Sequence, residues 1–340
     1  MKKLLLILCI MMIMTSFIFA GGKKEIVWVW YPNESTPEKA DARIELIKIV
    51  EKALGRPVKE QLTTDYAIAI EALVNDNAAF SWLGGEGYTQ AHNKNSAILP
   101  LVVDSGKSGT LKDAKYYSML GVLKDNGDMY KNGDKYSIDN LVQKKFSFVS
   151  NSSTSGFRIP SSVISAYFAK TDQFKGLKSE DLLEGGKDSL FSQVMFGGSH
   201  QGSMLNMLTQ KSEVSAFCNM CVSAYVEWVN GSMDDPRAGD LVKIKKGAAE
   251  PFDKLVGTEF TLISTTPVLN APMVVNTNLL TEKEVEAIRV ALTSDETTNN
   301  EKIFVPKGAN YTGLGFKQGV RFVRVEDKWY DPIRELSGLK

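Results

Sequence analysis

Residues 144–160 read KKFSFVSNSSTSGFRIP, and the rest of the chain is organised around this stretch. Phe146 and Phe148 are β-forming residues, which predict a short buried strand. Small hydroxyl and amide residues follow at 151–155, and residues 161–170 have the apolar spacing of a helix. A strand, a small-residue turn and a helix start direct backbone N–H groups and hydroxyls towards one place, which favours anion binding. An ordinary helix cap is the alternative, because Ser and Thr are common capping residues.

The first twenty residues have the features of a secretory signal peptide. Lys2 and Lys3 are followed by an apolar run and then by small residues up to Ala20. We therefore predict cleavage after Ala20 and a protein exported to the periplasm. The apolar run is shorter than the ~20 residues of a membrane span, and the absence of a cysteine at the cleavage point argues against a lipid anchor.

Composition narrows the classes of function. Forty basic and forty acidic side chains leave no net charge, so we predict neither nucleic acid nor an acidic membrane surface as a partner. Only two histidines are present, His92 and His200, which argues against a histidine-rich metal site; we expect no metal and no cofactor. After the signal peptide the cysteines form one CxxC pair, Cys218 and Cys221. A disulfide and two free thiols both remain open for this pair, and we assign it no catalytic role.

Strand and helix patterns alternate along the chain, which predicts an α/β protein with largely parallel sheets. Before residue 125 the predicted strands are 25–31, 58–62, 78–83, 98–103 and 116–124, and the predicted helices start near residues 36, 66 and 87, the first of them ending at Gly55. Further on we predict a strand at 214–217, a helix at 222–229 and, from the Thr281–Glu284 capping box, a helix that runs to Leu292.

The chain crosses twice between two predicted lobes. A polar stretch at 125–134 marks the first crossing, and a proline-containing segment near 267–272 marks the return. We place the first lobe at 21–120 plus 270–340 and the second at 121–269. Lobes built from βα units bind ligands in the cleft at the strand ends and close over them by hinge motion.

Several short stretches match a known family in their order and spacing. They are 64–67 (TDYA), 81–84 (SWLG), 117–118 with 123–124, 153–157 (STSGF) with Pro160, 198–200 (GSH), 213–214 and 330–335 (YDPIRE). In these stretches the chain resembles the periplasmic phosphonate- and phosphate-binding proteins of ABC importers, the PhnD-like family of type II solute-binding proteins. The resemblance implies two lobes, each a mainly parallel sheet flanked by helices, joined by a double-crossing hinge.

The resemblance also implies a binding site for a phosphorus oxyanion. The residues it implies are Ser153, Thr154, Ser155 and Gly156 in the loop, with Tyr66, His200, Trp82, Leu83 and Met220 around it. A desolvated oxyanion needs several hydrogen-bond donors, which the Ser-Thr-Ser loop supplies. His200 has the alternative of capping the next helix, and Tyr66 that of a half-buried aromatic. Arg158 we expect to point outward, as most arginines do.

Departures from the family pattern bear on the ligand. Members that bind aminoethylphosphonate hold its ammonium with two acids, and the matching positions here are Met220 and the segment 269–272, which has no acid. Because an unpaired buried ammonium is unfavourable, an aminoalkyl ligand is disfavoured. Leu83 replaces a second cleft tyrosine, and Glu86 and Tyr88 lie close enough in sequence to line the pocket.

The leading hypothesis is therefore a non-enzymatic, monomeric receptor that captures phosphate, phosphite or a small phosphonate. It would deliver the ligand to the transmembrane subunits of an ABC permease. One alternative keeps the fold but presents the ligand to a sensor kinase. Another is an exported serine hydrolase with His200 as its base; the sequence has no GxSxG nucleophile elbow to support it.

Overall fold

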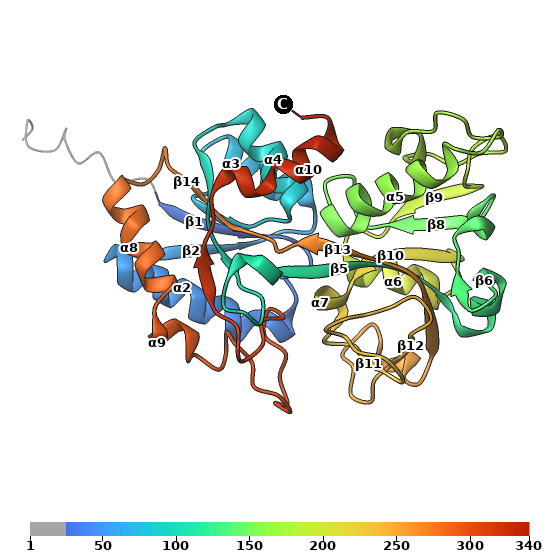
Figure 1. The fold of residues 1–340 in the computed structure, drawn as a ribbon. Helices are drawn as coiled ribbons and strands as arrows, with labels where there is room; N and C mark the ends of the chain where they lie inside the picture. Colours follow the sequence, from blue (N-terminus) through green and yellow to red (C-terminus); the bar gives the residue numbers. More distant parts are fainter. Residues whose placement is uncertain (1–24, 340) are drawn as a thin grey trace, which may run out of the picture.

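The computed structural model describes residues 25–339, and the predicted signal peptide lies outside these residues. The described chain forms two lobes joined by two extended strands (Figure 1). Within 25–339, no helix is both long enough and apolar enough to cross a membrane.

The first lobe is built on a six-stranded sheet with the order β15-β4-β14-β3-β1-β2. Its strands are β1 (Ile26–Trp30), β2 (Val58–Leu62), β3 (Phe80–Trp82), β4 (Ile98–Asp104), β14 (Met273–Asn276) and β15 (Phe322–Arg324). Strand β1 pairs in parallel with β2 and β3, whereas β14 is antiparallel to both β3 and β4. Strand β15 is likewise antiparallel to β4. The returning chain thus adds two strands of opposite direction to the sheet, β14 inside it and β15 at its edge.

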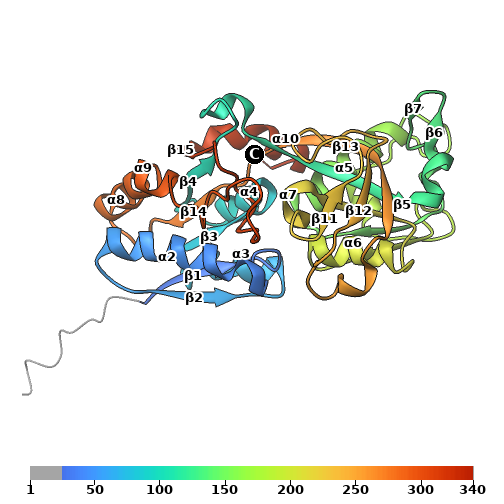
Figure 2. The same ribbon diagram turned by 90° about the horizontal axis from the view of Figure 1, so that it is seen from below.

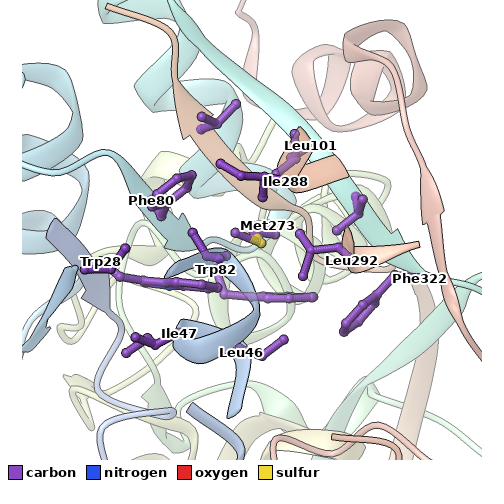
Figure 3. Close-up of a cluster of buried hydrophobic side chains, with 14 of the residues drawn as sticks. Trp28, Leu46, Ile47, Phe80, Trp82, Leu101, Met273, Ile288, Leu292 and Phe322 are labelled. Carbon is purple, nitrogen blue, oxygen red and sulfur yellow. The ribbon is translucent and has the colours of Figure 1, made fainter. Parts of the chain in front are cut away.

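Strand β1 explains why this sheet lies between two layers of helices. Its sequence IVWVW is apolar at every position, and all five residues are buried. Since successive side chains of a strand point to opposite faces, Trp28 and Trp30 pack on one face, with Phe80, while Val27 and Val29 pack on the other. Figure 3 shows the first of these cores, where Trp28, Trp82 and Phe322 lie under the helix that carries Leu46 and Ile47.

The second lobe is built on a seven-stranded sheet with the order β11-β12-β13-β5-β10-β8-β9. Its strands are β5 (Lys115–Leu123), β8 (Lys145–Phe148), β9 (Gln193–Phe196), β10 (Val214–Cys218), β11 (Val226–Trp228), β12 (Leu241–Ile244) and β13 (Glu259–Leu269), and a separate hairpin joins β6 (Lys131–Asn132) to β7 (Lys135–Tyr136). Only the β10–β8 and β8–β9 pairs are parallel. The two predicted lobes are present, but both sheets are mixed rather than mainly parallel, because strands that return between the lobes pair antiparallel with their neighbours.

Helices cover both faces of the two sheets. They are α2 (Ala40–Leu54), α3 (Tyr66–Val74), α4 (Gly85–Lys94), α5 (Ile159–Phe168), α6 (His200–Leu208), α7 (Asn219–Val222), α8 (Glu282–Leu292), α9 (Asp295–Thr298) and α10 (Asp331–Ser337). Two predicted helix ends are confirmed: α2 ends at Gly55, which has a positive φ of 66°, and α8 starts with the Thr281–Glu284 capping box. The predicted helix at 222–229 is wrong, because Val226–Trp228 forms β11 and pairs with β12.

Two strands connect the lobes. Strand β5 leads into the second lobe and β13 leads back, and they pair antiparallel from Lys115↔Leu269 to Leu123↔Phe260, with one bulge between Leu262 and Ser264. Figure 2 shows this pair side by side at the junction of the lobes. The connection between the lobes is therefore a paired two-stranded ribbon.

Candidate ligand-binding site

The anion loop, residues 151–156, lies between β8 and α5. Ser153 caps a π-helical turn (Thr154–Arg158) that runs directly into α5. Its Oγ accepts a hydrogen bond from the Gly156 N–H at 3.1 Å. Gly156 is required by close packing, since a Cβ there would lie 2.3 Å from Val149 Cγ2. The helix cap expected as the alternative is thus present at Ser153, in a loop that also carries a cluster of hydroxyls, and anion binding by this loop stays a prediction.

The hydrogen bonds of the loop direct its hydroxyl protons. Ser153 Oγ already accepts from Gly156, and Thr154 Oγ1 accepts from the Glu86 N–H of the first lobe at 2.8 Å. A hydroxyl has a single proton, so each oxygen that accepts from the protein keeps its own proton for another partner. One acceptor position of each hydroxyl is thus used by the protein, and the proton of Ser153 and of Thr154 can be donated to another group.

Ser155 completes the row of hydroxyls. Its backbone carbonyl accepts a hydrogen bond from Ser118 Oγ on β5 at 2.7 Å. Burial raises the pKa of Tyr116 to about 12, and hydrogen bonding with the Ser155 and Thr154 side chains opposes that rise. The Tyr116 hydroxyl, carried on the connecting strand β5, therefore faces the same part of the loop.

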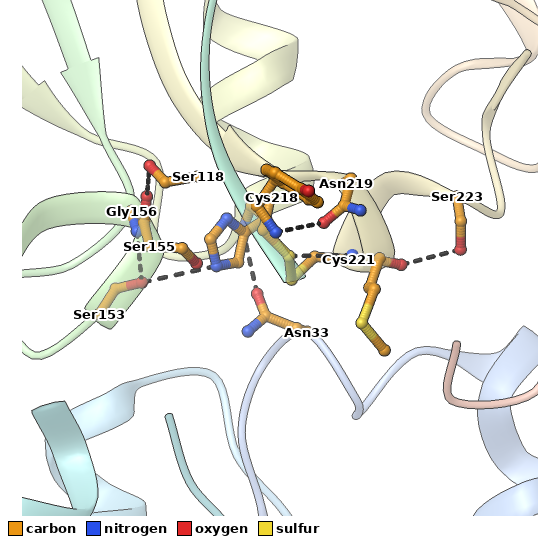
Figure 4. The surroundings of a disulfide bond; sticks show 12 residues. Asn33, Ser118, Ser153, Ser155, Gly156, Cys218, Asn219, Cys221 and Ser223 are labelled. Carbon is orange, nitrogen blue, oxygen red and sulfur yellow. Dashed lines mark hydrogen bonds between the residues drawn. A yellow bond between two sulfur atoms is a disulfide. The ribbon is translucent and has the colours of Figure 1, made fainter. Parts of the chain in front are cut away.

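Asn33 joins the first lobe to the second across the cleft. Its Oδ1 accepts from the backbone N–H of His200 at 3.0 Å, and its Nδ2 donates to the Tyr66 hydroxyl. The backbone N–H can only donate, which fixes the orientation of the amide and leaves the proton of Tyr66 free to donate. Figure 4 shows Asn33 reaching from a first-lobe loop towards Ser153, Ser155 and the Cys218–Cys221 disulfide.

His200 is buried at the start of α6, next to the loop. It is 3% exposed, and its Nε2 lies 3.5 Å from Ser153 Oγ. Burial and the positive charge of Lys39 lower its pKa to about 3, so the ring is neutral at physiological pH. Its Nδ1 is buried and has no hydrogen-bond partner within residues 25–339. A neutral imidazole of this kind donates from one nitrogen only.

These groups meet around one cavity of about 80 Å³ between the lobes. One enclosed water molecule needs a cavity volume on the order of 10–15 Å³, so this cavity has room for roughly five to eight water-sized groups. Its lining residues are Tyr31, Asn33, Glu34, Lys39, Tyr66, Trp82, Gly84, Asp104, Tyr116, Ser153, Thr154, Ser155, His200, Cys218, Met220, Cys221, Asn270, Ala271, Leu314 and Phe316.

Seven of the nine residues expected at the site line this cavity: Ser153, Thr154, Ser155, Tyr66, His200, Trp82 and Met220. Gly156 lies behind the loop and uses its N–H for the Ser153 cap. Leu83 is fully buried in the first-lobe core. Glu86 and Tyr88 do not reach the cavity wall; Tyr88 bonds instead to Asp327.

The expectation that Arg158 points outward is wrong. Its side chain is buried and donates to Glu86 of the first lobe at 3.2 Å and to Glu180 at 3.3 Å. Glu86 is 1% exposed, so its charge needs a partner. Arg158 therefore neutralises a carboxylate across the lobe junction, and it is absent from the cavity wall.

Three charged residues of the cavity were not anticipated. Burial raises the pKa of Glu34 and of Asp104 to about 7 each, although Lys39 opposes the shift of Glu34. Burial lowers the pKa of Lys39, and nearby carboxylates oppose this. The Lys39 Nζ donates to the backbone carbonyl of Asn33 at 2.7 Å. The cavity thus holds acids that burial pushes towards their neutral form.

One sequence signal would have found part of this set. Tyr31, Asn33 and Glu34 follow the carboxyl end of β1, and ligands of open α/β sheets bind at that end of the strands. Asp104 likewise ends β4. Polar residues at the ends of both strands were therefore candidates from topology alone.

Cys218 and Cys221 form a disulfide, which decides between the two states left open by the sequence. Their sulfurs and a nitrogen of His200 lie within 4.8 Å of one another, a grouping that could hold a metal ion. The thiolate is the metal ligand, and a disulfide has none. In this oxidised form the pair is a wall of the cavity rather than a metal centre.

A family model described as the periplasmic substrate-binding protein of phosphonate ABC transporters matches residues 28–330. The chain belongs to this family. Its phosphonate-binding proteins serve transporters and are not enzymes.

Individual relatives are distant in sequence. The chain is 27% identical to the phosphate-import protein PhnD of Mycolicibacterium smegmatis over an aligned stretch of 188 residues. This stretch makes up 54% of this chain and about half (52%) of the length of that relative. PhnD1 of Prochlorococcus marinus, solved with methylphosphonate, superposes with a TM-score of 0.63 at 17% identity and covers 93% of this chain and 98% of its own. A binding protein of a phosphonate ABC transporter from Pseudomonas aeruginosa superposes with a TM-score of 0.62 at 17% identity. The superposition covers 93% of this chain and 86% of the Pseudomonas protein. These structures confirm the two-lobe fold of the family.

We expect Asp104→Asn to stabilise the protein in a pH-dependent manner. Between pH 3.8 and about 7 the unfolded chain loses the Asp104 proton while the folded protein keeps it, so stability falls as the pH rises through this range. Asparagine cannot ionise. The gain in the free energy of unfolding should grow from under ~1 kcal/mol at pH 4.5 to at most about 4 kcal/mol at pH 8.

Urea unfolding of both proteins at the two pH values measures this difference. Asp172→Asn, at an exposed position, is the matched control and should show no pH-dependent gain. An equal gain for Asp104→Asn at both pH values would contradict the assignment of a raised pKa to Asp104.

Proposed function

We propose that this protein captures a small phosphorus oxyanion in the cavity between its lobes, in the periplasm, and delivers it to the membrane subunits of an ABC transporter. The ligand class comprises phosphonate, phosphite and phosphate. The observation that carries the proposal is a set of hydroxyls from both lobes, Ser153 and Thr154 against Tyr66. Each of them accepts one hydrogen bond from a protein N–H group and keeps its own proton to donate.

Donors held in this way suit an oxyanion. A buried anion is stable only if its oxygens accept several hydrogen bonds. Ser155 and Tyr116 add further hydroxyls to the row, and neutral His200 adds a ring N–H. Lys39 brings one positive charge to the wall, so neutral donors need not balance the whole charge of the ligand.

The remaining wall favours a compact substituent on phosphorus. Trp82, Met220, Leu314 and Phe316 form an apolar part of the cavity. Met220 and Asn270 occupy the region where the sequence lacks the acids of aminoethylphosphonate binders. Together with the volume of about 80 Å³, this wall suits a hydrogen, hydroxyl or methyl substituent.

Two measurements test the function. Mass spectrometry of ligand released from denatured, freshly purified protein identifies what the cavity carries. Calorimetry of ligand-depleted protein with methylphosphonate, phosphite and phosphate should show tight 1:1 binding of at least one of them. Absence of binding by all three would defeat the proposal.

Ser155→Ala should weaken binding of the best ligand by on the order of 1–3 kcal/mol, or roughly 5- to 150-fold, because a buried anion loses one donor. Ser162→Ala is the matched control, since Ser162 on α5 bonds within its own lobe to the Arg158 carbonyl and does not line the cavity. Calorimetry that finds equal affinities for both variants would remove Ser155 from the site.

Asn33→Ala should also weaken ligand binding, by about 1–3 kcal/mol, although its effect comes through the closed arrangement of the lobes. It leaves the His200 backbone N–H unsatisfied and removes the donor that orients Tyr66. Asn75→Ala on the exposed end of α3 is the control. Small-angle scattering of the ligand-saturated proteins should show a larger radius of gyration for Asn33→Ala; compaction as complete as that of the wild type would contradict this role.

A further inference from the structure

Glu34 is an acid in the wall of a cavity built for an anion. It follows Asn33, at the end of β1, and lines the same cavity as the anion loop. Its Oε2 is buried and has no hydrogen-bond partner within residues 25–339. A buried carboxylate oxygen without a donor is unfavourable, so this atom points to a ligand group that would supply a proton.

Lys39 does not serve as that partner. No N–O contact within 4.0 Å joins Lys39 to Glu34 in the described part of the chain, and Lys39 Nζ bonds to the Asn33 carbonyl at 2.7 Å. The positive charge of Lys39 lowers the pKa of Glu34, but burial outweighs it and raises the pKa to about 7. Glu34 is therefore poised to gain or lose a proton near neutral pH.

Asp104 is the other acid of the cavity, and it already has a donor. Its Oδ2 accepts from Asn270 Nδ2 at 2.8 Å. Both acids act electrostatically on Tyr116, but of the two Glu34 is the one that acts on Tyr66, which also bonds with Ser153 of the loop. Its location and its unpartnered oxygen both favour Glu34 over Asp104 as the acid nearest a bound oxyanion.

The groups around Glu34 set the local charge. They are Lys39 and Arg43 on its own segment, Tyr31 at the end of β1, Tyr66 on α3, Tyr116 on β5, Asp104 at the end of β4 and His200 on α6. The tyrosines and His200 are neutral near pH 7, because burial raises the pKa of the tyrosines and lowers that of His200. An ionised Glu34 would therefore face a fully ionised ligand with Lys39 and Arg43 as the only positive charges among these residues.

Two acidic groups that share a site cannot both ionise without strong repulsion, and one proton between them removes it. We propose that Glu34 and the bound oxyanion share one proton through Glu34 Oε2, so that the cavity selects oxyanions with an ionisable P–OH group and rejects permanently ionised ones such as sulfate. This inference rests on the proposed function and adds a specificity-determining residue to it. When both partners enter ionised, the complex takes up one proton from solvent.

Calorimetry with methylphosphonate and sulfate at pH 8.5, in two buffers of different ionisation enthalpy, measures both consequences. The wild-type protein should take up about one proton per methylphosphonate bound, and its affinity should fall up to about tenfold per pH unit above pH 8. Sulfate should bind at least 100-fold more weakly. These readouts need no variant, so the inference can be tested even if a substitution prevents folding.

Glu34→Gln should abolish most of the proton uptake and tighten sulfate binding at least tenfold. Glu71→Gln, on the exposed face of α3, should behave as the wild type. Proton uptake that survives in Glu34→Gln and disappears in Asp104→Asn would overturn the assignment to Glu34. If methylphosphonate binds without proton uptake and sulfate binds equally well, the inference is overturned and the proposed function stays intact. If methylphosphonate, phosphite and phosphate all fail to bind, both the inference and the proposed function are defeated.

Discussion

An anion that leaves water for a closed cavity needs several hydrogen-bond donors, and the proposed site at residues 153–155 rests on this need. A hydroxyl that is free to rotate is an equally good acceptor. Here the backbone N–H groups of Gly156 and Glu86 donate to Ser153 and Thr154, so one acceptor position of each hydroxyl is used within the protein. The bond from Gly156 lies within the loop itself, so it holds Ser153 in place whatever the arrangement of the lobes, which is the advantage of a preorganised donor.

The same hydrogen bonds couple the site to the closure of the lobes. In one of these bonds the Glu86 N–H of the first lobe donates to Thr154 of the second lobe. In another, the His200 N–H of the second lobe donates to Asn33 of the first lobe. Gly84 allows the close approach, since a Cβ there would lie 2.6 Å from Thr154 Oγ1. Closure of the lobes and orientation of the donors are thus a single event, while the paired strands β5 and β13 keep the lobes connected.

Sequence patterns predicted the parts of this protein that depend on local chemistry. The strand, capped turn and helix around residues 151–156, the α2 stop at Gly55 and the α8 capping box each rest on a few neighbouring residues, and each was found. Contacts between distant segments could not be found in this way. Arg158 was expected at the surface because its partner, Glu86, is 72 residues away, and the helix expected at 222–229 gave way to β11 because pairing with β12 outweighs local preference. Glu34 and Asp104 could have been suspected from their places at strand ends, whereas Lys39 carries no such signal and reaches the cavity through the assembled fold.

A crystal structure of the protein with methylphosphonate tests the central claim most directly. The account predicts the phosphorus in the cavity between the lobes, with its oxygens about 2.5–3.2 Å from the hydroxyls of Ser153, Thr154 and Ser155. It also predicts that Tyr66 contacts the same group from the first lobe. A ligand bound elsewhere, or held in the cavity without contact to these three hydroxyls, would contradict the account.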